Sequence, residues 1–224
     1  MPATPIDWRV TTEGGDVSAV YEPPTAPASG VFVCAHGAAG SMRDRGMERV
    51  AQTLRSAGLG VVRFNFVYSE KKSGRPDPMP RLKACVADVV ARARTELAPK
   101  RLIIGGRSMG GRAASMLAAD GFECDGLLLL AYPLHPAGRP EQLRDAHFAA
   151  LRVPVLCFNG TRDALCRRDL MEASLEKTQA RWSMHWLDGA DHSFHVLKSS
   201  GRTDDDVFSE VATATHEWLS RSFA

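Results

Sequence analysis

The sequence contains no long apolar segment. No apolar run in its 224 residues approaches the roughly 18 residues that a membrane-spanning helix needs. Residues 1–10 also lack the apolar core of a secretory signal peptide. These absences argue against an integral membrane protein and against a secreted one. We therefore expect a cytoplasmic protein without a membrane partner.

Clusters of basic residues are absent as well. Lys and Arg number 28 and Asp and Glu number 26, which leaves a formal net charge of +2. Proteins that bind nucleic acid carry clustered basic side chains that neutralise phosphates. The even charge balance therefore predicts no nucleic-acid partner, and it leaves the oligomeric state open.

Disulfide and metal patterns are missing too. The five cysteines form an odd, scattered set without a C-x-x-C pair, at positions 34, 85, 124, 157 and 166. Such a set predicts reduced, mostly buried thiols. A zinc site on His192 and His195 would lack a supporting cluster of further ligands. We expect neither a metal nor an organic cofactor.

The composition is that of a globular protein with a sizeable core. Apolar residues make up 44% of the chain and charged residues 24%, and the length suits one domain better than two. No internal repeat or low-complexity segment divides the chain. We expect a single domain that spans residues 1–224.

Apolar runs alternate with segments of helical periodicity. Strands are expected near residues 8–11, 17–21, 31–35, 61–66, 102–104, 126–131, 154–159 and 183–187. Helices are expected near 47–57, from Pro80 to Ala93, after Ser108, at 168–179 and after a capping box at Thr203 and Asp206. Strands that are apolar throughout are covered on both faces. The pattern predicts an α/β fold with a mostly parallel central sheet and helices on both faces.

Two connecting segments bear on how the molecule is covered. The stretch 132–153 is stiffened at its start by prolines and has room for one short helix near 141–149. A helical lid needs more chain than this, so no large lid is expected. The other candidate cover, 69–79, is a polar loop with little apolar surface.

The pattern Gly106-x-Ser108-x-Gly110 follows an apolar strand and precedes small residues that begin a helix. In this context G-x-S-x-G forms a sharp turn that exposes the serine hydroxyl on a strained backbone. Glycines flank the serine because side chains there would collide where strand and helix approach. Ser108 is therefore the candidate nucleophile. The alternative is a glycine-rich turn without a catalytic role.

A serine nucleophile needs a base, and the base needs an acid that orients it. Asp163 follows the strand at 154–159, and His192 follows the last strand in a Gly-x-x-His context. We prefer His192 to His195 on the same loop, because His192 lies closer to the strand end. The alternative role of His195 is that of a packing or loop-tethering residue. Asp191 is a poor orienting acid, because adjacent side chains on an extended loop diverge. His135 also leaves a strand end and could line the cleft.

Backbone N–H groups must also stabilise the oxygen that becomes negative. One donor should be Met109, directly after the serine at the start of a helix. The other should be Ala38, within His36-Gly37-Ala38-Ala39-Gly40 after the first buried strand. Among the other histidines, His147 and His216 are expected on helix surfaces.

Five motifs occur in one order: HGAAG, GGRSMGGR, AYPLHP, NGTRDALC and GADHSF. Together they resemble the α/β-hydrolase superfamily from about Val31 onward. The resemblance is closer to a small lidless group related to dienelactone hydrolase, which also includes testis-expressed hydrolase-like proteins and the hydrolase-like subunit of the NSL acetyltransferase complex. It implies Ser108, Asp163 and His192 as a catalytic triad. Dienelactone hydrolases proper use cysteine where this sequence has serine.

These patterns predict a serine hydrolase that cleaves small carboxyl esters or thioesters through an acyl-enzyme. The alternative is a non-catalytic binding or scaffold protein on a hydrolase fold, which has no need of three matched groups. The basic residues Arg107, Arg112, Lys198 and Arg202 either attract an anionic substrate or are solvated or paired with acids.

Overall fold

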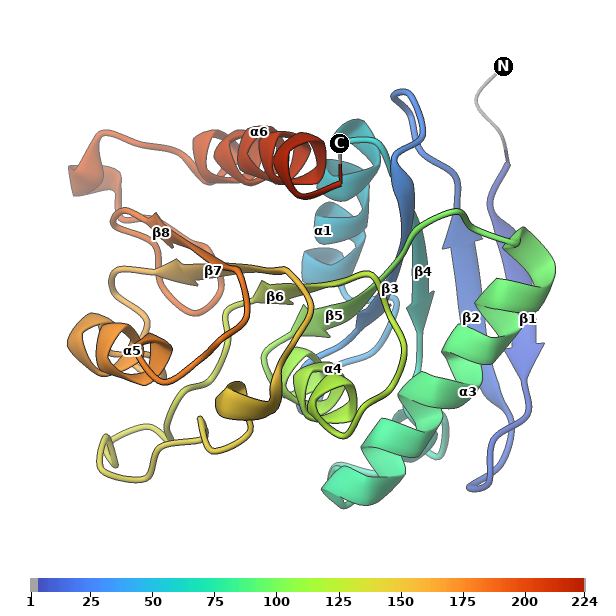
Figure 1. Ribbon diagram of the computed structural model, residues 1–224. Helices are drawn as coiled ribbons and strands as arrows, with labels where there is room; N and C mark the ends of the chain where they lie inside the picture. Colours follow the sequence, from blue (N-terminus) through green and yellow to red (C-terminus); the bar gives the residue numbers. More distant parts are fainter. Residues whose placement is uncertain (1–3, 224) are drawn as a thin grey trace.

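The computed structural model describes residues 4–223 and contains one eight-stranded sheet (Figure 1). Its spatial order is β1-β2-β4-β3-β5-β6-β7-β8. The strands are β1 Ile6–Val10, β2 Val17–Glu22, β3 Gly30–Ala35, β4 Leu59–Phe64, β5 Leu102–Arg107, β6 Gly126–Leu130, β7 Val155–Gly160 and β8 Trp182–Leu187. β1 and β2 pair antiparallel at one edge, and every neighbouring pair from β4 to β8 is parallel. The expected mostly parallel sheet is confirmed.

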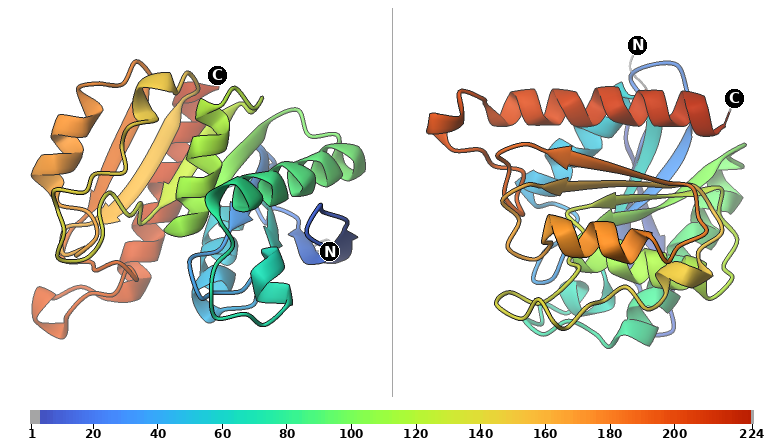
Figure 2. Two further views of the ribbon diagram at one scale, coloured as in Figure 1. Left: turned by 90° about the horizontal axis from the view of Figure 1, so that it is seen from below. Right: turned by 60° about the vertical axis from the view of Figure 1, so that its left-hand side comes forward.

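Helices cover both faces of the sheet, as Figures 1 and 2 show. One face carries α1 (Arg45–Ser56) and α6 (Asp204–Ser222), which pack with that face of the strands into one apolar cluster. The other face carries α3 (Met79–Leu97), α4 (Met109–Ala119) and α5 (Arg168–Leu175), which pack into a second cluster. Because both faces are buried, the central strands are apolar at almost every position.

All five expected helices are present, and one of them was predicted too long. The capping box is present, since the Thr203 side chain accepts from the Asp206 N–H and the Asp206 side chain accepts from the Thr203 N–H. A helix begins at Met79, next to the expected Pro80. α5 ends at Leu175 rather than near 179, and a short helix, α2 (Val67–Glu70), overlaps the start of the expected loop 69–79.

The segment 141–149, which has room for one short helix, forms no α-helix. Only a single 3₁₀ turn forms there, at Phe148–Ala150. The loop satisfies its backbone groups by tertiary contacts instead: the Arg144 N–H donates to the Leu134 carbonyl, and the Tyr132 hydroxyl donates to the Arg144 carbonyl. Local periodicity does not predict such partners. No helical lid covers the sheet in the segment 132–153.

His147 also differs from expectation, whereas His216 is exposed on α6 as predicted. The His147 ring packs edge-on against Phe148, and its Nε2 lies 2.9 Å from Ser115 Oγ on α4. Burial, with a smaller effect of the Arg112 charge, lowers the pKa of His147 from 6.5 to about 4. His147 is therefore a neutral packing residue near neutral pH.

This burial predicts a pH-dependent contribution to stability. The unfolded chain takes up a proton on His147 near pH 6.5, whereas the folded protein resists protonation down to about pH 4. The contribution is therefore present above pH 6.5 and is lost as the pH falls towards 4. Between these values wild type should lose on the order of 2 kcal/mol more unfolding free energy than His147→Gln. Urea titrations at each pH measure this difference.

The matched control is His216→Gln, which removes an exposed histidine from α6. Its unfolding free energy should follow the wild-type pH dependence. Parallel curves for wild type and His147→Gln would contradict the burial argument.

Candidate active site

The nucleophile candidate lies on the turn between β5 and α4. Ser108 adopts φ 49° and ψ −116°, a strained conformation for a residue other than glycine. Its N–H donates to the carbonyl of Leu130 at the end of β6, which fixes the turn against the neighbouring strand. The turn therefore presents the Ser108 side chain at the carboxyl edge of the sheet.

The glycines around Ser108 are required by a close approach to β3. A Cβ on Gly106 would lie 2.1 Å from the Ala35 carbonyl oxygen, and a Cβ on Gly110 would lie 2.5 Å from the same oxygen. The collision is thus chiefly with the end of the adjacent strand. A Cβ on Gly111 would in turn lie 2.6 Å from the Gly106 oxygen, so helix and strand also touch directly.

The structure brings the three predicted side chains into one hydrogen-bonded chain. His192 Nε2 lies 3.0 Å from Ser108 Oγ, and His192 Nδ1 lies 2.8 Å from Asp163 Oδ2. The Asp163 side chain is completely buried, whereas that of His192 is 28% exposed. A carboxylate acceptor fixes the proton on Nδ1, which leaves Nε2 free to accept the serine proton.

Asn159, which the sequence reasoning missed, supports the acid. Its Nδ2 donates to Asp163 Oδ2 over 3.1 Å, and it also binds both the N–H and the carbonyl of Tyr132. The Leu165 N–H donates to the other carboxylate oxygen of Asp163. Asn159 is fully buried at the end of β7. The signal for this role in the sequence was a polar residue, Asn159, directly after the apolar run PVLCF.

The Arg107 side chain anchors the loop that carries His192. Its guanidinium donates to the His192 carbonyl oxygen over 2.9 Å. Burial lowers the pKa of Arg107, and the nearby negative charges of Asp191, Asp163 and Asp44 oppose that shift. Three acids therefore lie close enough to act on the Arg107 charge.

The remaining candidates on the loop after β8 have structural partners. Asp191 accepts from the N–H groups of Ser193 and His195, so its side chain shapes the turn, and His192 Nδ1 binds Asp163 instead. His195 Nδ1 binds the Asp204 carboxylate at the start of α6. Within residues 4–223 no group of three or more potential ligands is placed to hold a metal ion.

The segment 36–40 lies beside the serine. His36 is buried, and its Nε2 accepts from the Phe66 N–H while its Nδ1 contacts the Gly37 carbonyl. Burial lowers the pKa of His36, which keeps the ring neutral in this role. Ala38 is exposed next to Ser108, and its N–H donates no hydrogen bond within the described chain. The Met109 N–H, in the first turn of α4, points out of the helix.

A cleft of about 610 Å³ opens over Ser108 and His192. Its other lining residues include Ala38, Asp44, Arg107 and Leu165. A larger hollow of about 840 Å³ lies between α1 and α6 and is lined by none of the three predicted catalytic residues. Size alone therefore does not mark the site. His135 is buried and accepts from the Arg167 N–H, so it supports a loop and is not among the cleft residues.

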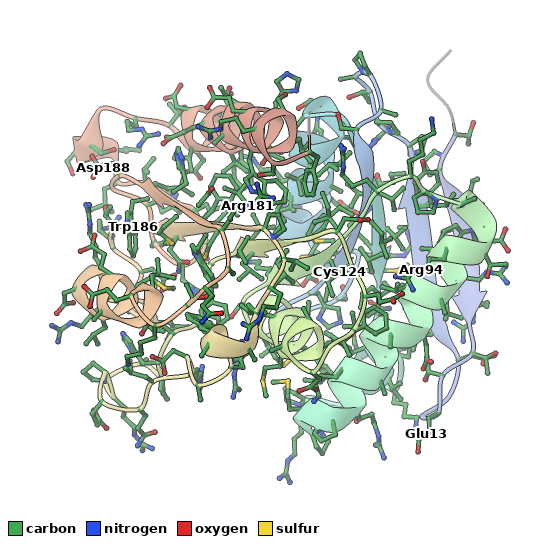
Figure 3. All side chains as sticks on the ribbon, in the orientation of Figure 1. Glu13, Arg94, Cys124, Arg181, Trp186 and Asp188 are labelled. Atoms are coloured by element: carbon green, nitrogen blue, oxygen red, sulfur yellow. The ribbon has the colours of Figure 1, made fainter. Side chains whose placement is uncertain are left out.

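The cysteines do not line the cleft over Ser108, although the Cys157 thiol donates to Asn159 Oδ1. Burial raises the pKa of the Cys34 and Cys85 thiols to about 12 and that of Cys124 to about 11. Cys124 is the half-buried one, and it precedes β6, at the opposite end of the sheet from Asp188, which follows β8 (Figure 3).

These pKa shifts predict slow alkylation of the native protein. A thiol must lose its proton to react, and at pH 8 almost none is thiolate when the pKa is 11 or more. Iodoacetamide should label Cys124 first and leave Cys34 and Cys157 unmodified, as peptide mass spectrometry can measure. Rapid labelling of Cys34 in the folded protein would contradict its burial between β3 and the helices that cover this face of the sheet.

The sequence also matches a known protein family. The profile of the alpha/beta hydrolase domain matches residues 28–220. The quorum-quenching protein AidA of Acinetobacter baumannii is 28% identical over 126 residues, a match that covers 54% of this chain and 41% of AidA. The chain thus spans under half the length of this curated relative.

Solved structures show the same fold. A serine hydrolase without a lid from Xanthomonas campestris superposes with a TM-score of 0.73 at 21% identity, covering 99% of this chain and 96% of that one. A dienelactone hydrolase from Anabaena variabilis superposes with a TM-score of 0.77 at 18% identity, covering 100% of both chains. With the profile match over most of its length, the chain belongs to the alpha/beta hydrolase domain family.

Proposed function

We propose that this protein is a serine hydrolase that cleaves small carboxyl esters or thioesters. The observation that carries the proposal is the continuous hydrogen-bonded chain from Asp163 through His192 to Ser108. This chain ends on a strained turn beneath an open cleft. Its members follow the order serine, acid, histidine, which is the order of α/β-hydrolases.

The reaction would proceed through an acyl-enzyme. Ser108 Oγ attacks the carbonyl carbon while His192 Nε2 takes its proton, and the carbonyl oxygen becomes negative. The Ala38 and Met109 N–H groups stabilise this oxygen. His192 then gives the proton to the departing alcohol or thiol as the bond to the carbonyl carbon breaks. Water attacks the acyl-enzyme with His192 as base, which releases the acid and restores Ser108.

The first test is Ser108→Ala. It should abolish labelling by a fluorophosphonate probe and lower kcat by on the order of 10⁴-fold or more, because no other hydroxyl contacts His192 Nε2 in the described chain. Circular dichroism should show an intact fold. Unlabelled wild-type protein would instead favour the non-catalytic binding or scaffold role.

The choice of acid is tested by a matched pair of substitutions. Asp163→Asn should be severely impaired, since an amide at this place no longer fixes the proton on His192 Nδ1. Asp191→Asn should keep most of the activity, because its amide oxygen can still accept from Ser193 and His195. Steady-state kcat/KM for one ester measures both. The reverse ranking would assign the acid to Asp191.

The open cleft predicts a preference for short acyl groups. Each added CH₂ contributes about 0.8 kcal/mol only when it is buried. The segment 132–153 supplies no helical cover, and charged Asp44 and Arg107 line the cleft itself. kcat/KM for p-nitrophenyl esters should therefore peak between acetate and butyrate and fall by octanoate. A series that rises through decanoate would reveal an apolar tunnel.

A further inference from the structure

The Arg107 guanidinium lies where the serine turn meets the loop that carries His192, residues 188–196 (the histidine loop). Arg107 is the last residue of β5 and directly precedes Ser108, and its Nη2 donates to the His192 carbonyl oxygen over 2.9 Å. Arg107, Ser108 and His192 all line the cleft of about 610 Å³. One side chain therefore links the main chain at the nucleophile to the main chain at the base.

Helix α1 leaves space for this guanidinium at Gly46. A Cβ on Gly46, in the first turn of α1, would lie 2.9 Å from Arg107 Nη1. Any other residue at this position would meet the guanidinium, so glycine permits the close approach. The half-buried Arg107 side chain is thus held between α1 on one side and the His192 carbonyl on the other.

Other contacts fix the two ends of the histidine loop. At its start, the Arg162 N–H donates to the Ala190 carbonyl over 2.9 Å, and the Arg162 guanidinium donates to the Gly189 carbonyl over 2.9 Å. Near its end, Phe194 is buried and its ring packs edge-on against Phe208 of α6. These contacts hold the loop on either side of the catalytic position and not at that position itself.

The His192 main chain has Arg107 as its partner. Within residues 4–223 no backbone N–H donates to the His192 carbonyl, and Arg107 Nη2 is the side-chain donor that does. Phe194, two residues further on, adopts φ 65°, which is unfavourable for a residue other than glycine. A strained turn keeps its shape only where surrounding contacts impose it. The place from which the His192 ring projects therefore depends on Arg107.

The charge of Arg107 suits this role. Burial lowers its pKa while Asp191, Asp163 and Asp44 oppose the shift, and an arginine stays protonated near neutral pH. A hydrogen bond from a charged donor is stronger than one between neutral groups. The contact can therefore hold the His192 carbonyl at the edge of a cleft where water competes for it.

We propose that Arg107 is a positioning residue for catalysis, which holds the His192 main chain so that Nε2 stays within reach of Ser108 Oγ. Asp163 orients the ring through Nδ1, whereas Arg107 fixes the backbone that carries the ring. The gap from Nε2 to Oγ is 3.0 Å, and a displacement of about 1 Å at a catalytic group lowers the rate on the order of 10²-fold. The inference rests on the proposed hydrolase activity.

The test compares Arg107→Ala with Arg162→Ala, a matched control. Arg162 also donates to a carbonyl of the histidine loop over 2.9 Å, but at Gly189 and from an exposed side chain. With p-nitrophenyl acetate, Arg107→Ala should lower kcat about 10- to 100-fold. Its KM should stay within about twofold of wild type, because His192 serves both acylation and deacylation and both steps slow together. Arg162→Ala should keep both constants.

A raised KM with an unchanged kcat in Arg107→Ala would assign Arg107 to substrate binding and overturn the positioning role. An equal loss of kcat in both variants would show a general effect of the loop and would overturn it as well.

Chemical rescue separates positioning from a loss of structure. Guanidinium chloride at about 50 mM, far below the molar concentrations that unfold proteins, supplies the missing group to Arg107→Ala. The variant should recover part of its lost kcat and then saturate, relative to sodium chloride at equal ionic strength. A protein that is merely destabilised would lose activity under the same treatment. The absence of any recovery in folded Arg107→Ala would contradict the proposal.

If Arg107→Ala does not fold, Gly46→Ala decides. The added methyl group displaces the guanidinium, because it would otherwise lie 2.9 Å from Arg107 Nη1. Alanine is also the better helix former, so Tm should not fall. An unchanged kcat in this variant would overturn the positioning role.

Failure of the inference is distinguishable from failure of the proposed function. Wild-type protein that neither hydrolyses esters nor reacts with a fluorophosphonate probe would refute the hydrolase function, and this inference with it. An active wild type whose kcat is matched by Arg107→Ala refutes the positioning role alone.

Discussion

The contact between the serine turn and the end of β3 controls the geometry of the site. Gly106 and Gly110 both bring backbone against the Ala35 carbonyl, at separations where a Cβ would collide. This approach fixes Ser108 in its strained conformation and places it beside the segment 36–40, which follows β3 directly. A larger residue at either glycine would push strand and turn apart. The distance from Ser108 to the Ala38 N–H thus depends on having glycine, which lacks a side chain, at both positions.

Parallel strands explain why residues distant in sequence meet here. β5, β7 and β8 run in the same direction, so the segments after them emerge at one edge of the sheet. Asp163 and His192 come from two of these segments, and backbone contacts join the segments: a Cβ on Gly160 would lie 2.1 Å from the Ala190 oxygen. The 2.8 Å contact between Asp163 and His192 therefore rests on close packing of their loops.

The sequence predicted what local patterns encode. Apolar strands gave the sheet and its class, and G-x-S-x-G, the Asp after a strand and Gly-x-x-His placed three side chains that the fold does bring together. Contacts between distant segments were out of reach. Asn159 acts through Tyr132 and Asp163, and His147 is buried by Ser115 on α4. The segment 141–149 forms no α-helix for the same reason, since the loop makes its hydrogen bonds with distant segments.

The two arginines on either side of Ser108 differ in the groups that surround their side chains. Arg107 and Arg112 look alike in GGRSMGGR, and the sequence treats both as possible anion receptors. In the fold, Arg107 lies among Asp191, Asp163 and Asp44 and donates to a carbonyl, so an added anion would meet surrounding negative charge. Arg112 has a buried Nε donor without an acceptor in the described part of the chain. The two arginines of one motif thus differ in their hydrogen-bond partners, which the local sequence does not encode.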